Sequence, residues 1–196
     1  MKKIVSILFF AVLTFSLFGQ SKDELNDSES ILWLGLDFTK ARFEGKYDFE
    51  SPDALTGKYL TAWNKLMLQE PDKFNVGKYF DFVTVDTDFD IAMEHNEGLD
   101  KEKIFLDAGE ISKYSLDEET VQKIVSGYDA EYDGYALLFV VESFSKTAVQ
   151  ANIWVTFFHV PTKKVVSAKK MSVEPGGFGV RNYWAGAVYK VMKEWD

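Results

Sequence analysis

Three consecutive β-strand patterns in the last third of the chain constrain the fold more than any other feature. The runs Tyr135–Phe144, Val149–Val160 and Lys164–Val173 are rich in Val, Phe, Trp and Ile, and short turns separate them. Runs of strong strand propensity joined by short turns predict an antiparallel meander. The first two runs are apolar on both faces, so helices should cover at least one face of the sheet. Lys169 and Lys170 make the third run an edge strand.

A helix should follow the third strand. The Pro-Gly-Gly-Phe-Gly turn at 175–179 precedes apolar residues at helical spacing, among them Trp184, Val191 and Trp195. Such a stripe marks an amphipathic helix whose apolar face is buried. We therefore expect this C-terminal helix to pack on the strands at 135–160.

The residues before the meander alternate between strand and helix patterns. Ile31–Phe38 is apolar on both faces and short, which is typical of a buried central strand. Ser51 followed by Pro52 begins a helix that extends to about Gln69. The other expected elements are a loop at 39–50, a strand around 80–85, a helix around 90–97, and a helix opened by a capping box at 115–118. The sequence thus predicts an α/β (α+β) fold: a mixed sheet with a C-terminal three-strand antiparallel meander, packed by helices including the C-terminal amphipathic helix.

The N-terminus has the pattern of a secretory signal. Lys2 and Lys3 precede an almost continuously apolar stretch, Ile4–Phe18, which is short for a membrane-spanning helix. We expect cleavage after Gly19, with an uncleaved signal anchor as the alternative. The sequence therefore predicts a signal peptide at 1–19, a polar lead-in at 20–30 and a single α/β domain at 31–196. No integral membrane segment is expected after signal cleavage.

Composition excludes several classes of function. The chain of 196 residues has no cysteine, which excludes disulfides, thiolate metal sites, cysteine nucleophiles and the lipid anchor of lipoproteins. The net charge of −9 argues against nonspecific nucleic-acid binding, which depends on a basic surface. The protein is expected to be exported to the periplasm or the extracellular space without a lipid anchor.

An acidic segment partly matches a calcium-binding loop. Asp86, Asp88, Asp90 and Glu97 occupy positions 1, 3, 5 and 12 of such a loop. The sixth position needs a glycine for a sharp bend, but Ile91 stands there, and a β-branched residue disfavours positive φ. A second partial match at 129–134 lacks the twelfth ligand. No metal and no cofactor is therefore expected, and the simpler interpretation is a strand whose acidic end precedes a helix.

The glycine turn before the last helix is the candidate ligand or partner site. Gly176, Gly177 and Gly179 lie where free N–H groups at a helix N-terminus can hold an anion, and Arg181 could support a carboxylate or phosphate. The spacing is neither a dinucleotide-binding fingerprint nor a P-loop. The alternative is a hinge that lets the helix fold back onto the sheet.

Motifs for catalysis are few. The chain has two histidines, His95 and His159, and lacks the His-Glu-x-x-His and Gly-x-Ser-x-Gly motifs. Paired carboxylates for hydrolysis remain open, because such partners need not be close in sequence. No catalytic residue is assigned.

The order of elements from Ile31 onward resembles the TolB N-terminal and CsgG-type periplasmic α/β module, chiefly through the hairpins at 135–173 and the helix at 184–195. The Phe-Gly-Gln boundary at 18–20 and the Gly-Phe-Gly-Val-Arg-Asn-Tyr-Trp stretch at 177–184 resemble uncharacterised exported proteins of the Bacteroidota. The chain lacks the propeller that follows in TolB and the lipid-anchoring cysteine of CsgG, and no functional residue is carried over.

The sequence favours an exported, non-catalytic envelope or secreted binding module. Its partner would be an unknown protein or small ligand of the envelope. The alternative from another class is a metal-independent hydrolase that uses paired carboxylates, and a calcium-binding domain is the third. A cleft that joins several acids would favour the enzyme, whereas an exposed apolar or aromatic surface would favour the binding module.

Overall fold

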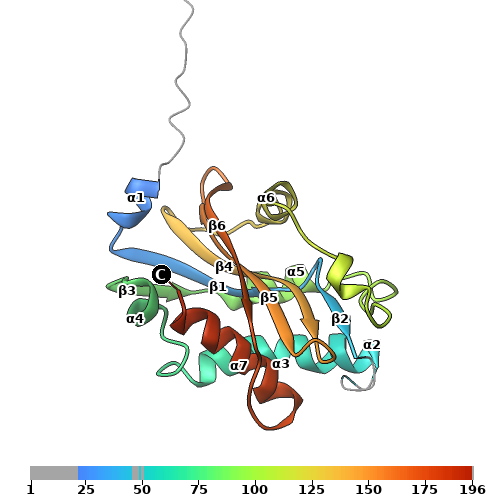
Figure 1. Ribbon diagram of the computed structural model, residues 1–196. Coiled ribbons are helices and arrows are strands. Elements are labelled where there is room, and N and C mark those ends of the chain that lie inside the picture. The colour runs from blue at the N-terminus through green and yellow to red at the C-terminus, as the bar shows by residue number, and fades with distance from the viewer. Residues whose placement is uncertain (1–21, 46–48, 50, 196) are drawn as a thin grey trace, which may run out of the picture.

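A mixed sheet of six strands forms the centre of the molecule (Figure 1). The computed structural model describes residues 22–45, 49 and 51–195. The strands are β1 (Ser30–Asp37), β2 (Arg42–Glu44), β3 (Thr84–Thr87), β4 (Tyr135–Ser145), β5 (Gln150–His159) and β6 (Lys164–Val173). Their order is β3-β1-β4-β5-β6, and the short β2 pairs with the end of β4.

Parallel and antiparallel pairs divide this sheet into two halves. β1 is parallel to both β3 and β4, whereas β4, β5 and β6 form the predicted antiparallel meander. β6 lies at the edge, as its lysines Lys169 and Lys170 indicated. The predicted mixed α/β fold is confirmed.

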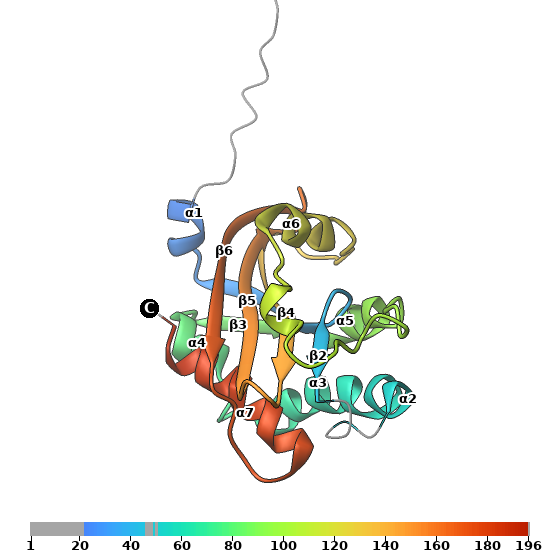
Figure 2. The same ribbon diagram turned by 45° about the vertical axis from the view of Figure 1, so that its right-hand side comes forward.

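Helices cover the sheet on its two faces. They are α1 (Lys22–Asn26), α2 (Pro52–Ala54), a π-helix (Leu55–Tyr59), α3 (Leu60–Gln69), α4 (Val76–Phe80), α5 (Phe89–Asn96), a 3₁₀ turn (Ile111–Lys113), α6 (Glu118–Ser126) and α7 (Gly179–Lys193). α3 and α7 lie on one side and α6 lies on the other in both views (Figure 1, Figure 2). Each side has its own hydrophobic cluster, so the sheet is buried on both faces.

The C-terminal helix packs on the meander as expected. The Trp184 ring stacks on Phe144 of β4 with a centroid distance of 4.5 Å and an interplanar angle of 3°. It also stacks on Phe49 at 5.6 Å. Trp184, Val188 and Val191 are buried in the larger cluster, which confirms the apolar stripe.

A bulge at Gly35 changes the alternation of side chains along β1. Before the bulge, Trp33 points to the larger cluster and Leu34 to the smaller one. The pairing with β4 shifts register between Trp33 and Leu36, and Leu36 then points to the larger cluster. Gly35 has φ of +88°, and a Cβ there would lie 2.5 Å from Asn64 Oδ1. Only glycine is compatible with this position, and the bulge directs the next side chain, Asp37, to the face covered by α6.

The strand predicted around 80–85 is wrong in its position. Phe80 ends α4, which Asn75 caps by accepting a hydrogen bond from the Lys78 N–H at 2.8 Å. The strand begins only at Thr84. The apolar character of this segment comes from Phe80, which packs on the ring of Phe157 at 5.8 Å.

Two further boundaries differ from the sequence prediction. The capping residue of α6 is Asp117 rather than Ser115: its Oδ1 accepts from the Thr120 N–H at 2.8 Å, so the helix starts at Glu118. The loop predicted at 39–50 contains β2, whose three residues are too few to show a pattern in sequence.

The predicted signal peptide at 1–19 lies outside the described residues. The described part of the polar lead-in includes α1, and its Leu25 is buried in the larger cluster. Among residues 22–45, 49 and 51–195, no helix is long and apolar enough to cross a membrane.

Candidate functional site

A buried carboxylate at the carboxyl end of β1 is one place to look for a site. In open α/β sheets, ligands bind outside the carboxyl ends of parallel strands where the chain changes direction across the sheet. β1 lies at such a point, between two parallel neighbours. Asp37 is fully buried there, at the last position of the strand.

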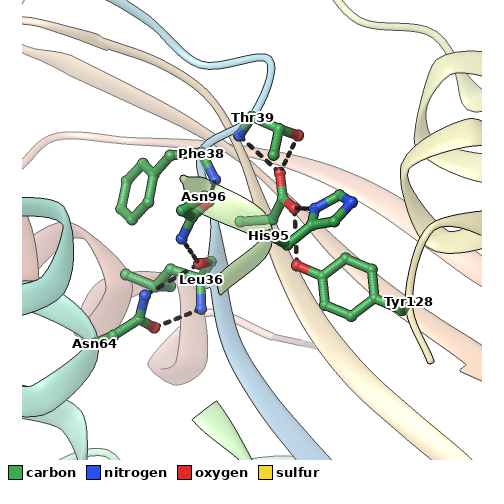
Figure 3. Close-up of polar contacts among 8 residues, drawn as sticks. Leu36, Phe38, Thr39, Asn64, His95, Asn96 and Tyr128 are labelled. Carbon is green, nitrogen blue, oxygen red and sulfur yellow. Dashed lines mark hydrogen bonds and ion pairs between the residues drawn. The ribbon is translucent and has the colours of Figure 1, made fainter. Parts of the chain in front are cut away.

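Four donors surround the Asp37 carboxylate. Oδ1 accepts from the Thr39 N–H at 2.9 Å and from the Thr39 hydroxyl at 2.6 Å. Oδ2 lies 2.7 Å from His95 Nδ1 and accepts from the Tyr128 hydroxyl at 2.7 Å (Figure 3). Burial, followed by the charge of Asp37 and the hydrogen bond to it, raises the pKa of Tyr128 well above its usual value, so this phenol remains protonated.

Two asparagines complete the same end of β1. β3 ends at Thr87, opposite Trp33, so the strand that would pair with the next residues of β1 is missing on that side. Asn64 of α3 accepts from the Leu36 N–H at 2.8 Å and donates to the Leu36 carbonyl at 3.1 Å. Asn96 of α5 donates to the same carbonyl at 2.9 Å and accepts from the Phe38 N–H at 2.6 Å. The two amides replace a strand neighbour and attach both helices to the sheet.

Asp37 and His95 are the residue types of a catalytic Asp–His pair, but both ring nitrogens of His95 face other groups of the protein. A carboxylate that holds one ring nitrogen orients the other nitrogen as a base. The second nitrogen of His95, Nε2, faces the backbone of Gly127, because a Cβ at Gly127 would lie 2.7 Å from it. The His95 side chain is only 28% exposed. Through His95 and Tyr128, the arrangement joins β1 to α5 and to the segment that follows α6, which is a structural role.

In the described part of the chain, the other buried carboxylates are Glu44 and Glu142, and they too accept hydrogen bonds from the protein. Glu44 of β2 accepts from the Gly109 N–H at 2.6 Å and from the Ser145 hydroxyl. In the middle of β4, Glu142 accepts from the Leu116 N–H at 2.9 Å and from Trp154 Nε1 at 3.0 Å, and Lys170 Nζ lies 2.6 Å from its other oxygen. Because these contacts come from separate segments, the two carboxylates hold loops and strands together.

A cavity beside α5 contains none of these buried carboxylates. It has a volume of about 580 Å³ and lies between α5 and the π-helix with α3. Its acids, Asp90, Glu94 and Glu97, are exposed on one face of α5, and Lys65 and Lys101 line it too. The cavity is open, and its charged side chains, which have both signs, lie at the solvent boundary.

The acidic segment that partly matched a calcium loop is divided between two elements. Asp86 belongs to β3, Asp88 immediately precedes α5, and Asp90 lies in its first turn. Ile91 is a helical residue of α5, not the residue of a sharp bend. Within the described ranges, no group of three or more His, Cys, Asp and Glu side chains is placed to hold a metal ion.

The structure brings together the three glycines of the predicted ligand site. Gly176 and Gly177 lie in the turn before α7, and Gly179 is its first residue. Gly177 and Gly179 line a hollow of about 230 Å³ with Lys146 and Tyr183, among others. Gly176 and Gly177 also line a groove of about 430 Å³ along α7. The turn therefore separates two hollows.

Arg181, the fourth predicted residue, lines neither of these hollows. Its side chain is exposed, and its backbone carbonyl accepts from Trp63 Nε1 at 3.0 Å. The observed contact of this residue is thus made by its backbone, which attaches the start of α7 to α3.

Close backbone contacts determine the shape of the turn. A Cβ at Gly186 would lie 1.9 Å from the Gly176 carbonyl oxygen, so α7 touches the turn through backbone atoms. The Gly176 N–H donates to the Tyr183 carbonyl at 3.2 Å. Gly177 and Gly179 have φ of +137° and +77°, a region that favours glycine.

Phe178, between these two glycines, is 95% exposed. The structure thereby adds an apolar residue to the site that the glycine pattern did not indicate. The sequence did contain a sign of this exposure, because Phe178 precedes the helix and lies outside the buried stripe of α7.

The groove along α7 is lined by basic and aromatic side chains. Lys73, Lys190, Lys193 and Tyr189 line it, and the ammonium groups of Lys73 and Lys193 lie 5.8 and 5.7 Å from the Tyr189 ring centroid. The hydrogen bond with Tyr79 lowers the pKa of Tyr189, and the nearby lysines lower it further, while partial burial opposes them. This electropositive surface lies on a protein of net charge −9.

Comparison with known proteins identifies no family. No family model matches the chain, and no curated protein matches it. Among solved structures, the chain is similar to the LpoB C-terminal domain from Salmonella enterica, with 15% sequence identity and a TM-score of 0.31. The similarity covers 75% of this chain and 84% of that chain. A likeness at this level assigns no function, and the resemblances noted in the sequence stay predictions.

Proposed function

We propose that this protein is an exported, non-catalytic interaction module of the cell envelope or of the secreted fraction, and that the turn at 176–181 is its binding surface. The basic residues Lys2 and Lys3 and the apolar stretch Ile4–Phe18 support export. In this proposal the signal at 1–19 is removed, and residues 31–196 act as one domain behind the lead-in at 20–30. The partner is an unknown protein or small ligand of the envelope.

The exposure of Phe178 is the observation that carries this proposal. Exposing a large apolar ring to water is unfavourable, and aromatic residues at the centre of an interface often supply much of the binding energy. The flanking glycines, Gly177 and Gly179, have positive φ, and hollows lie beside the turn. The turn stands between these two hollows, so a partner with a complementary shape can pack around it.

The buried carboxylates support a binding module over a hydrolase. Within residues 22–45, 49 and 51–195, the buried carboxylates Asp37, Glu44 and Glu142 each accept hydrogen bonds from the protein itself, which supports a structural role for them. The exposed acids of α5 lie in an open cavity. The geometry therefore favours recognition.

Site-specific photo-crosslinking in the host tests the proposal. A photoreactive amino acid at position 178 should give a discrete crosslinked product in envelope or secreted fractions. The matched control is position 83, since Val83 is also apolar and is 80% exposed, but lies just before β3. No product at 178, or the same products at both positions, would contradict the proposed binding surface.

N-terminal sequencing tests export separately. Protein isolated from its host should begin near Gln20. Intact Met1 on protein in the cytoplasm would show that the signal interpretation is wrong.

A further inference from the structure

We infer that the groove along α7 binds an extended, acidic segment of a partner protein, with the acidic side chains toward the C-terminal end of the helix. This inference rests on the proposed function, because it gives the partner at the 176–181 turn its chemistry. The argument comes from the shape of the groove, its charge and its position beside Phe178.

The groove is elongated. On α7 its lining extends from Asn182 through Gly186 to Lys193, and Glu70 and Lys73 line it as well. At 1.5 Å per helical residue these positions span roughly 16 Å, which matches about five residues of an extended chain. A single small anion would occupy only part of this length.

The charge of the groove is unbalanced within the protein. Lys73 pairs with Glu70 at 3.1 Å. In the part of the chain that the structure describes, no ion pair joins Lys190, Lys193 or the nearby Lys78 to a carboxylate. In a chain with 31 acidic residues, the ammonium group of Lys78 lies over the Tyr79 ring, that of Lys193 lies over the Tyr189 ring, and Lys190 lines the groove. Complementarity then calls for carboxylates from outside.

The two ends of the groove differ in chemistry. Lys190 and Lys193 lie at the C-terminal end of α7, while Gly176 and Gly177 lie at the other end, next to Phe178. An occupant that uses the whole surface carries acidic side chains at one end and meets an apolar ring at the other. A peptide segment provides both.

A membrane surface is the rival occupant, because an exposed aromatic residue with nearby lysines also suits anionic lipid. The hollows beside the Phe178 turn argue against it. A flat bilayer surface leaves a groove of about 430 Å³ unfilled, whereas a protein segment can enter it. The shape thus favours a protein partner.

Peptide binding to charge-reversal variants tests the inference. The probe is a fluorescently labelled hexaglutamate peptide, measured by anisotropy with the purified full chain at low salt, and hexaserine is the neutral control. Lys190→Glu with Lys193→Glu should weaken hexaglutamate binding by about tenfold or more, because both positions line the groove. Lys113→Glu with Lys164→Glu makes the same change in net charge at exposed sites elsewhere and should weaken it by less than about twofold.

Several results would overturn the inference. One is equal weakening by the two pairs of substitutions, and another is no hexaglutamate binding by the unaltered protein. Displacement by inorganic pyrophosphate as effective as by unlabelled hexaglutamate would assign the groove to small anions instead. Flotation with phosphatidylglycerol vesicles that depends on Phe178 would favour the membrane.

The same variants separate this inference from the proposed function. If the Lys190→Glu, Lys193→Glu protein fails to lose peptide affinity but position 178 still gives its crosslinked product, the groove inference fails and the binding surface stands. If position 178 gives no product in the unaltered protein, the proposed function itself fails.

Discussion

At the carboxyl end of β1, four donors surround one buried carboxylate, whereas along α7 a phenylalanine ring and several lysines face the solvent. The fold treats the two regions differently because burial makes an unpaired polar group costly. Polar groups that are fully matched inside the protein hold its segments together. Groups left at the surface without an internal partner remain able to bind another molecule, so polar residues alone do not locate a site.

The largest expected effect is a loss of stability when the buried face of α7 is altered. Replacing Trp184 by Ala removes the ring that stacks on Phe144 and Phe49, and should lower the free energy of unfolding by about 3–5 kcal/mol. Urea denaturation measures this loss. A variant as stable as the unaltered protein would show that α7 is not held on the sheet, and the comparison of the two regions would fail.

Asp37→Ala tests whether the cluster at β1 is structural. Four donors lose their acceptor, so we expect a loss of about 3 kcal/mol, and Asp37→Asn should cost less because it keeps an acceptor oxygen. Asp90→Ala, at an exposed acid of α5, is the control and should change stability by less than about 0.5 kcal/mol. Similar losses in Asp37→Ala and Asp90→Ala would remove the distinction between buried and exposed acids.

The pH dependence of stability tests, at Tyr128, whether the cluster around Asp37 is structural. The raised pKa of Tyr128 means that the folded state keeps the phenol protonated above pH 10.0, the ordinary value at which the unfolded chain ionises. Stability from this group is complete below that value and is lost as the pH rises above it. Tyr128→Phe should cost about 1 kcal/mol at pH 7 and should show a shallower alkaline decline. Parallel declines in thermal unfolding between pH 9 and 11 would contradict the assignment.

The smallest effects on stability are expected at the exposed turn. Phe178→Ser and Arg181→Ala should each change the free energy of unfolding by less than about 0.5 kcal/mol, because both side chains are exposed. Binding to a partner should fall markedly with Phe178→Ser. Arg181→Ala should also weaken binding, because its exposed side chain belongs to the proposed surface at 176–181. A melting temperature that drops with Phe178→Ser would mean that the ring supports the fold.

The sequence was most informative where the pattern repeats over many residues. The strands β4 to β6 were predictable because runs rich in Val, Phe, Trp and Ile extend over ten or more residues between short turns, and α7 was predictable from its period-3.6 apolar stripe. The predicted position of β3 was wrong because apolar residues such as Phe80 and Phe82 also occur in helices and turns that pack on a core. β2 has three residues and no detectable period.

The candidate sites were predictable only in part. The glycines of the 176–179 turn stand next to one another in sequence, so their pattern was visible. His95 and Tyr128 lie 58 and 91 residues from Asp37, and no local pattern links them. A charged residue within the apolar run Ile31–Phe38 was the one available sign that Asp37 needs partners. The lysines of the groove come from separate segments, and their meeting depends on how α7 packs beside α3 and α4.

The backbone contact between Gly186 and the Gly176 carbonyl has a consequence for binding thermodynamics. A loop that must become ordered on association loses conformational entropy, and this loss reduces the affinity. Here the turn is already held against α7 by that contact and by the Gly176 hydrogen bond to Tyr183. Phe178 is thus preorganised, and a partner would meet it in its binding geometry. Gly186→Ala, which forces the helix and the turn apart, should therefore weaken binding through slower association as well as faster dissociation.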